Sequence, residues 1–494
     1  MHDKFPVGHP VVYIDEECKQ VIGDDNDISK VEGLIKCTVL PPRNLYHPVL
    51  PVRMYGKLMF ALCRSCCDAL NQNLCIHENS EDRTFTGTWV SVELQKAVGM
   101  GYIITKIEEI WQYEVSQYDP STRIGGLFVD YIDTFLKVKQ ESSGWLIACI
   151  DEESKQKYLD DYKKAEGITL ERERVAKNSE LRAKLCLNSF WGKFGQRENQ
   201  PKTTIVTDGK TFLETVSDPK KEILSVLPVS DDVVYINWCN VDDTIEPSRI
   251  TNVVIAAYTT AQARLRLYAL LEKIGRQCLY YDTDSIIFIR SDTPDSKDLQ
   301  TGTNLGDLTD ELEDYGEGSY ISEFASCGRK CYAYKVETPK GVTDYICKVE
   351  GISLNYANTK SINFDTLKSF ATTGISPEGD EEVVLSYKSL RRTPMHDVIT
   401  RNETKTFKNN FVKRRLVDNY DSVPYVKKSC NQDDLTIMRQ QLDNPQVITI
   451  YDDEAVVKTE PASPPLPLYP ESDMLLMSPE VEEALENLLN IEEA

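Results

Sequence analysis

The sequence contains no run of 18 apolar residues, and its first ten residues, MHDKFPVGHP, hold neither a basic stretch nor an apolar core. The first absence argues against a membrane-spanning helix, which needs about 20 consecutive apolar residues. The second argues against a secretory signal peptide. No internal repeat is present, which excludes a solenoid. We therefore expect an intracellular protein with no membrane partner, in a nucleus or an organelle that the sequence does not distinguish.

Positive charge is scarce, because 56 Lys and Arg stand against 79 Asp and Glu and give a formal net charge of −23. This excludes a uniformly basic nucleic-acid-binding protein. Residues 452–494 hold twelve acidic residues and one lysine, so this stretch carries −11 and the rest of the chain −12. Five prolines also lie between Pro461 and Pro470. We expect residues 429–494 to be a disordered acidic tail, whose end, SPEVEEALENLLNIEEA, has the pattern of a short partner-binding amphipathic helix.

Local clusters of cations can still attract DNA, because salt screens charge over about 8–10 Å. FKNNFVKRRLVDN is one such cluster, and FLKVKQESSG is a smaller one. Their cations are Lys408, Lys413, Arg414 and Arg415, and Lys137 and Lys139, respectively. The alternative for the first cluster is the solvated face of a helix.

Most of the 14 cysteines are scattered in apolar segments, as expected for reduced thiols. The exception is LCRSCCDALNQNLCIH, in which Cys63, Cys66, Cys75 and His77 have the spacing C-x2-C-x8-C-x-H. Three thiolates and an imidazole suit a closed tetrahedral structural zinc site. Cys67 is an alternative ligand, and the alternative to a metal site is a reduced cysteine-rich loop.

Periodicity gives a coarse order of elements. A region of mostly strands and loops is expected to about residue 140, and within it the prolines of LPPRNLYHPVLP forbid a helix. A helical hairpin follows over 151–167 and 178–194, with Asn178 as N-cap. Residues 200–248 are polar and strand-like. A third helix over 254–274 ends at Gly275 as C-cap and leads directly into YYDTDSIIFI, residues 280–289.

One face of the second helix carries a distinctive set of side chains. Lys184, Asn188 and Trp191 are spaced by four and three residues, and Gly192 follows. A cation, an amide and a flat ring would suit a nucleoside triphosphate, with the lysine on phosphate oxygens. The alternative is an ordinary surface helix with a half-buried tryptophan.

Asp282 and Asp284 stand one residue apart between β-branched and aromatic residues. Like charges on one strand face repel, so we expect a cation between them and a third group. Magnesium prefers few protein oxygens and keeps waters or phosphates. Two such ions about 3.5–4 Å apart would clamp both oxygens of an in-line phosphoryl displacement.

These segments resemble family B DNA polymerases. KLCLNSFWG, residues 184–192, matches the motif K-x3-N-S-x-Y-G, and YYDTDS matches Y-x-D-T-D-S in the family's order. Two segments resemble the protein-primed branch. In TTAQAR, Thr260 and Arg264 match T-x2-[GA]-R, and in RKCYAY, Lys330 and Tyr332 match K-x-Y. The resemblance covers about residues 1–425 and looks nearest to polymerases of Maverick/Polinton-type transposons and related viral and organellar elements.

The resemblance implies an α+β fold with right-hand polymerase architecture: a palm sheet, two-helix fingers and a thumb, without the exonuclease domain. The implied divisions are 1–134, palm segment with a cysteine-rich insertion; 135–198, fingers; 199–250, palm insertion; 251–355, palm catalytic core; 356–428, thumb; and 429–494, the acidic tail.

The resemblance also implies roles for the matched residues. Asp284 would bind metal directly, with Asp282 as its partner, and two Mg²⁺ ions would act in DNA-directed DNA synthesis. The other roles are a triphosphate contact for Lys184; nucleotide binding for Asn188, Trp191 and Gly192; and DNA binding for Thr260, Arg264, Lys330 and Tyr332. Implied partners are primer-template DNA, deoxynucleoside triphosphates and a priming protein, which a zinc-tied insertion would help to grip.

Two departures from the family pattern qualify this expectation. Trp191 stands where the family has tyrosine. More seriously, D-x2-S-L-Y-P, whose aspartate supplies the other main metal ligand, does not occur, and the FPVGHP that typically follows it begins at Phe5. We therefore expect an N-terminally truncated polymerase with impaired activity, because Asp3, Asp15 and Asp24 lack the right context to substitute. The alternatives are a catalytically inactive, polymerase-derived DNA-binding protein with a structural zinc site, and an interaction protein that recruits partners through its acidic tail.

Overall fold

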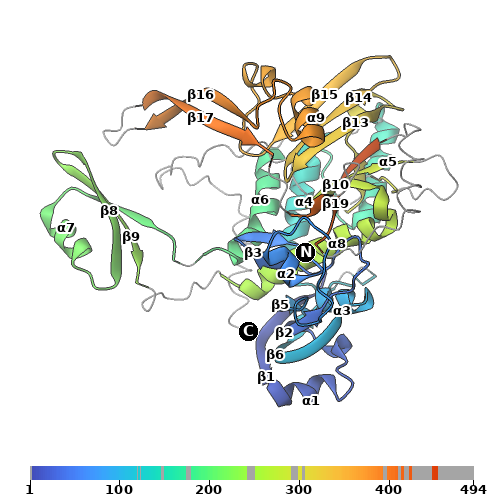
Figure 1. Cartoon of the computed structure of the whole chain (residues 1–494), viewed down its shortest axis with the longest axis vertical. Coiled ribbons are helices and arrows are strands. Elements are labelled where there is room, and N and C mark those ends of the chain that lie inside the picture. The colour runs from blue at the N-terminus through green and yellow to red at the C-terminus, as the bar shows by residue number, and fades with distance from the viewer. Residues whose placement is uncertain are drawn as a thin grey trace.

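The computed structural model shows a mixed α/β protein (Figure 1). It describes residues 3–119, 121–122, 124–145, 149–173, 180–197, 199–241, 251–290, 299–302, 306–392, 398–409, 413–416, 422–425 and 448–453. Asn178, the predicted N-cap, lies outside these residues, as do the side chains of Lys184 and Arg415. Among the described helices, none is both long and apolar enough to span a bilayer.

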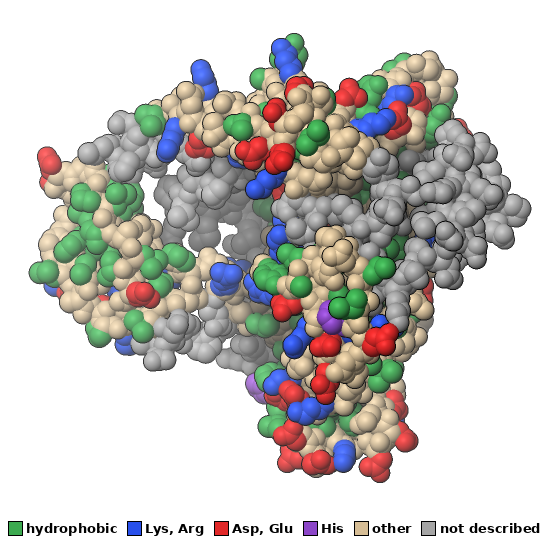
Figure 2. All heavy atoms as spheres, viewed as in Figure 1, with side chains coloured by type: hydrophobic (Ala, Val, Ile, Leu, Met, Phe, Trp, Pro, Cys, Tyr) green, Lys and Arg blue, Asp and Glu red, His purple; other side chains and the backbone are tan. Residues whose placement is uncertain are grey.

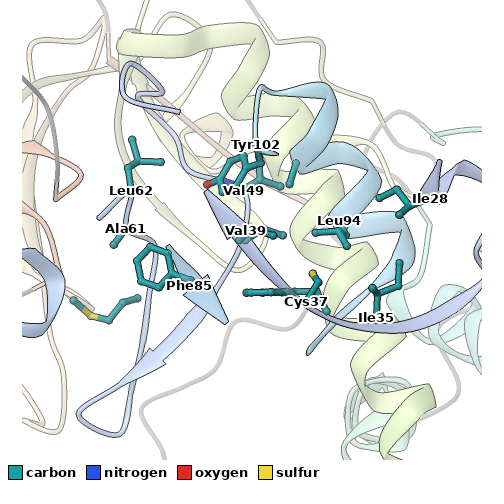
Figure 3. Packing of buried hydrophobic residues seen from close by; sticks show 14 of the residues in the cluster. Ile28, Ile35, Cys37, Val39, Val49, Ala61, Leu62, Phe85, Leu94 and Tyr102 are labelled. Atoms are coloured by element: carbon teal, nitrogen blue, oxygen red, sulfur yellow. The ribbon is translucent and has the colours of Figure 1, made fainter. Parts of the chain in front are cut away.

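The N-terminal part is a four-stranded antiparallel sheet in the order β1-β6-β2-β5. Its elements are β1 (Phe5–Ile14), η1 (Asp15–Cys18), α1 (Lys19–Ile22), η2 (Ile28–Lys30), β2 (Gly33–Leu40), β5 (Phe85–Val90), α3 (Ser91–Gly99) and β6 (Ile103–Ser116). Alternate residues of β2 are buried, as period-two patterning requires. Ile35, Cys37 and Val39 pack toward Leu94 of α3 and Tyr102 in one core (Figure 3). A short unit of β3 (Val52–Met54), β4 (Lys57–Met59) and α2 (Arg64–Asp68) adds Met59 and Leu62 to that core.

Four helices form the middle of the chain: α4 (Val129–Ser143), α5 (Glu152–Glu166), α6 (Glu180–Phe194) and α8 (Val253–Ile274). The predicted end of α8 is confirmed, since Gly275 caps it with φ 56°. The expectation of strands and loops to residue 140 is wrong at α3 and α4, and the 134/135 boundary falls inside α4. Tyr131, Ile132 and Phe135 suggest a strand by their residue types, but their spacing matches one helix face, and all three are buried.

The helix that packs on α6 is therefore α4, with the Tyr131 and Phe190 rings stacked at 4.0 Å. Phe128, just before α4, contacts Phe190 and Phe194, and Ile255, Tyr258 and Ala261 of α8 complete this core. α5 packs on α4 through Tyr162 and Leu136. The predicted 151–167 and 178–194 hairpin is thus corrected to a three-helix arrangement centred on α4.

Residues 202–240 form their own unit, a three-stranded sheet in the order β7-β9-β8 with one helix. Its elements are β7 (Lys202–Val206), α7 (Gly209–Val216), β8 (Lys221–Ser230) and β9 (Val233–Asn240). The prediction of strands over 200–248 is confirmed at β7, β8 and β9 and missed α7; residues 242–248 lie outside the described residues. Apolar side chains gather on the visible surface of this unit at the left of Figure 2. Exposed apolar side chains of this unit include Ile205, Leu213 and Val226, whose exposed fractions are 61%, 66% and 43%.

The central sheet has the order β10-β11-β20-β13-β14-β15, with β12 also pairing with β20. Its strands are β10 (Cys278–Asp282), β11 (Ser285–Ile289), β12 (Leu308–Asp310), β13 (Tyr320–Gly328), β14 (Cys331–Glu337), β15 (Thr343–Val349) and β20 (Ile448–Asp453); η4 (Gly275–Gln277) and η5 (Glu313–Tyr315) flank them. The expectation of a disordered 429–494 tail is therefore corrected at 448–453, because ITIYDD begins with β-branched and aromatic residues that fill a place in the sheet.

Beyond β15 lie η6 (Asn358–Lys360), α9 (Phe364–Thr373), the long hairpin β16 (Glu382–Arg392) and β17 (Val398–Lys408), and the short pair β18 (Arg415–Leu416) and β19 (Ser422–Val423). Phe364 and Phe370 of α9 and Phe407 of β17 share one core with Cys327 of β13. Of the basic segment predicted over 407–419, Lys408 ends β17 and Arg415 begins β18, so neither lies on a helix; residues 410–412 and 417–419 lie outside the described residues. Arg414 donates to Ser422 and Tyr46, so it binds within the protein.

Candidate functional site

The two aspartates lie at the turn of the β10–β11 hairpin. Asp282 ends β10 opposite Ser285, and the loop consists of Thr283, with φ 54°, and Asp284. Ser285 Oγ donates to the Asp282 carbonyl at 3.1 Å, which tightens the turn. The strands behind it are fixed by α8, because Leu271 and Ile274 pack on Ile286 and Phe288. Both carboxylates are half-buried and stand on a rigid support.

A second tight turn meets this one. Lys330, with φ 50°, joins β13 to β14, and its backbone N–H donates to the Tyr280 hydroxyl at 3.0 Å. Its Nζ lies 3.6 Å from Asp282 Oδ2. The Tyr332 ring lies 4.7 Å from the Tyr280 ring. The K-x-Y and Y-x-D-T-D-S segments, about 50 residues apart in sequence, are therefore adjacent in space.

Two further cations, Lys413 and Arg329, lie near the Asp282 turn. Burial and then the positive charge of Arg329 lower the pKa of Lys413, while Asp282 and Glu350 oppose that change. Arg329 itself pairs with Glu350, with Nε 3.2 Å from Oε2. Cations interleaved with carboxylates can bind both metal ions and phosphate oxygens.

The two predicted DNA-binding residues of α8 are used inside the protein. Thr260 Oγ1 donates to the carbonyl of Ala257 at 3.0 Å. Arg264 binds Glu93 of α3 through two hydrogen bonds of 2.7 and 3.0 Å. Burial raises the pKa of Glu93, and the Arg264 guanidinium opposes part of that rise. This ion pair ties α8 to the N-terminal sheet.

The predicted nucleotide-binding residues lie on α6. Asn188 is half-buried, Trp191 is 40% exposed, and a Cβ added at Gly192 would meet nothing within 4 Å. The side chain of Lys184 lies outside the described part of the structure. α6 packs on the first half of α8 and the aspartate hairpin on its last turns, so both elements share one support.

The substitutes considered for the missing metal ligand are placed unfavourably. Asp3 pairs with Arg266 of α8 at 3.3 Å. Asp15 begins η1 and Asp24 follows α1. In Figure 1, α1 lies at the lower end of the molecule, away from β10, which lies nearer its middle.

The cysteine-rich segment brings its four predicted ligands together. Cys63, Cys66, Cys75 and His77 present ligand atoms that all lie within 4.8 Å of one another. His77 Nδ1 lies 3.5, 3.3 and 3.7 Å from the three sulfurs. A tetrahedral zinc ion would set sulfur and nitrogen about 3.6 Å apart, given Zn–S of about 2.3 Å and Zn–N of about 2.0–2.1 Å. The donor set therefore fits zinc, and the alternative ligand Cys67 is outside it.

A buried arginine next to this cluster gives an independent test of fit. Arg83 is 5% exposed, and its Nε has no hydrogen-bond partner. Burial first and Arg43 second lower its pKa, while Cys63 and Cys75 act in the opposite direction. Arg83 Nη2 donates to the Pro41 carbonyl at 2.5 Å, but three neutral thiols would provide no negative charge beside this buried cation, whereas a zinc ion with three thiolates carries about one negative charge. Arg43, whose charge lowers the pKa of Arg83, also donates to the His77 carbonyl at 3.0 Å.

Sequence reasoning missed three residues of these sites. Tyr280 is the first residue of Y-x-D-T-D-S, so the motif contained it, although no role was assigned to it. Lys413 was assigned to a DNA-binding segment rather than to the Asp282 turn. Arg83 had no sequence signal, because the partner of a single arginine is decided by folding.

No family model matches the sequence, and the curated proteins contain no match either. Among solved structures, the chain is similar to one titled "Phi29 DNA polymerase complexed with primer-template DNA", with a TM-score of 0.42 and 14% identity. The similarity covers 82% of this chain and 55% of that one, so this chain spans a little over half the length of that polymerase.

Proposed function

We propose that this chain is a polymerase-type nucleotidyltransferase that adds deoxynucleotides to a DNA or protein-primed 3′ end. The observation that carries this proposal is the meeting of two tight turns, with Lys330 Nζ 3.6 Å from Asp282 Oδ2. Like carboxylates at the turn of a rigid hairpin, with cations beside them, suit a site that holds metal ions against phosphates.

In this proposal Asp284 and Asp282 hold Mg²⁺, which, when bound, would neutralise charge on the transferred phosphoryl group. The hairpin holds both carboxylates at a fixed spacing, so little reorganisation is needed during reaction. Lys330 and Tyr332, beside the turn, would contact the primer-template backbone, with Lys413 as an added contact. Arg264, bound to Glu93, would serve DNA binding by positioning α8.

The incoming nucleotide would bind between the hairpin and α6. Lys184 would contact its triphosphate, and Asn188 and Trp191 its sugar and base. Open space over Gly192 would admit a ring close to the helix backbone. The sequence holds no D-x2-S-L-Y-P segment, so we expect slow extension, because fewer carboxylates bind metal more weakly.

Primer extension by the purified chain with Mg²⁺ tests the proposal. Asp284→Asn should lower the extension rate by about a hundredfold or more, whereas Asp161→Asn, an exposed aspartate of α5, should leave it unchanged. DNA affinity without metal should be similar in all three proteins. Equal extension by the wild type and Asp284→Asn would overturn the proposal.

The second candidate is a catalytically inactive, polymerase-derived DNA-binding or interaction protein with a structural zinc site. This candidate is favoured by the geometry of Cys63, Cys66, Cys75 and His77, because a structural metal site can stabilise a protein that has no catalytic activity. Absence of extension together with DNA binding that survives Asp282→Asn/Asp284→Asn would support this candidate over the first. Capture of partners by the full chain but not by one lacking residues 452–494 would support the tail as the interaction element.

A further inference from the structure

One strand in the middle of the central sheet comes from the far end of the sequence. β20 lies between β11 on one side and β12 and β13 on the other, and pairs antiparallel with all three. Every residue of β11 has a partner in β20, from Ser285 opposite Asp452 to Ile289 opposite Ile448. More than 150 residues separate the two strands in the sequence, so this pairing is strictly long-range.

β11 cannot be an edge strand without penalty. Ile286, Ile287 and Phe288 are 0%, 3% and 0% exposed, so both faces of the strand are covered. In a central strand, successive residues direct their N–H and C=O groups alternately to the two neighbours. Without β20, the groups that face away from β10 would be buried and unpaired, and each would destabilise the fold by about 1–3 kcal/mol.

We propose that β11 and β12 form a binding slot for one extended strand, and that residues 448–453 of the same chain occupy it and thereby hold the Asp282 and Asp284 turn in place. The slot and its occupant rest on the sheet pairing alone. The consequence for activity rests on the proposed nucleotidyltransferase function.

Several features favour this segment as the occupant. Its first four residues, Ile448 to Tyr451, are β-branched or aromatic types that favour strands. Five of its six residues, Ile448 to Asp452, pair with the five residues of β11, and the sixth, Asp453, pairs with Leu308 of β12. The register sets its acidic end, Asp452, opposite Ser285, the end of the slot where Lys330 lies beside Asp282. Because the segment is covalently attached, its effective concentration is high.

Two shortened chains test the slot: one ends at Glu454, the other at Pro445. Amide hydrogen exchange of Ser285–Ile289 should be unchanged in the first and faster by about a hundredfold or more in the second. The peptide QVITIYDDE, residues 446–454, should bind the second chain and restore most of the protection, and the same peptide with Ile450→Pro should not, because proline removes a ladder hydrogen bond.

Full-length Ile450→Pro provides a second measure if the shorter chain fails to fold, and it should show the same fast exchange confined to the hairpin. Equal protection in both shortened chains, or no binding of the peptide, would overturn the proposal. If light scattering shows that the full-length chain is a dimer with exchanged strands, a second copy supplies the strand. That result would overturn the proposal that residues 448–453 of the same chain occupy the slot. None of these readouts needs catalysis or metal, so their failure is separate from failure of the proposed function.

Discussion

The aspartate hairpin and the zinc cluster differ in how far apart in the chain their parts lie. The four proposed zinc ligands lie within 15 residues of the sequence, and their donor atoms lie within 4.8 Å of one another. The hairpin depends on α8 behind it, on Lys330 beside it and on β20 at its edge. A local site is fixed by spacing and a metal ion, whereas a site assembled from distant segments is fixed by packing. The two should therefore respond differently to perturbation.

The largest expected effect is loss of the metal from the local site. Cys66→Ser should lower the zinc content from about one ion per chain to near zero, because structural zinc and local folding are coupled. Proteolysis within residues 52–90 should become rapid, while exchange in the hairpin stays slow. Cys149→Ser, a half-buried cysteine outside the cluster, should keep its zinc. Full zinc content in Cys66→Ser would contradict the site.

For the aspartate hairpin and its supports, the largest loss of stability is expected when the ion pair that ties α8 to α3 is broken. Arg264→Met leaves Glu93 as an unpaired buried charge, which should destabilise the fold by about 3–5 kcal/mol in urea unfolding. The same change in a Glu93→Gln background should be much smaller.

The effect of Arg264→Met should also depend on pH. Burial raises the pKa of Glu93 above its ordinary value of 4.5, and loss of Arg264 raises it further. At pH values between 4.5 and the raised pKa of Glu93 in the folded state, the folded state binds more protons than the unfolded state, so stability falls as pH rises. The variant should therefore lose more stability at pH 8 than at pH 5. A loss independent of pH would assign the effect to packing alone.

Arg83→Met probes the charge balance of the zinc cluster. Removal of a buried cation should weaken zinc binding by about 10–100-fold. In the metal-free protein the stability should change little, because relief of the buried charge offsets the loss of the hydrogen bond to the Pro41 carbonyl. Competition with a chelator measures the first quantity and thermal unfolding the second. Arg53→Met, at an exposed site in β3, serves as the control. A parallel loss of both quantities would indicate a purely structural role.

The smallest effect is expected for Tyr280→Phe, which removes the hydroxyl that accepts a hydrogen bond from the Lys330 backbone N–H. Stability should fall by about 1 kcal/mol, and exchange of the Lys330 amide should accelerate while zinc content stays constant. An unchanged Lys330 amide would show that the two turns are held together by ring packing alone.

The sequence predicts those features that depend on neighbouring residues. The Gly275 cap, the α5 helix and the Cys/His cluster follow from local spacing, and the structure contains all three. The resemblance assigned Asp282 to metal binding and Lys330 to DNA binding, and the structure sets Lys330 Nζ 3.6 Å from Asp282 Oδ2. Their chemical roles stay predictions.

Features decided by distant partners could not be predicted from the sequence. Arg264 matches a DNA-binding motif, yet its partner is Glu93, 171 residues away. The β20 segment lies in an acidic region, so its composition favoured disorder, while the gap that it fills exists only once the sheet has formed. At α4, aromatic and β-branched residues favoured a strand by propensity, and burial of one helical face decided otherwise.

Because α8 is one continuous helix, it fixes the orientation of the aspartate hairpin relative to α6 in the proposed active site. α6 packs on its first half and the aspartate hairpin on its last turns, with 22 residues in one unbroken helix. Each residue turns a helix by about 100° and advances it by about 1.5 Å. A single alanine inserted near Arg266 would therefore rotate Asp282 and Asp284 by about 100° around the helix axis relative to Asn188 and Trp191, although no residue at either place had been changed.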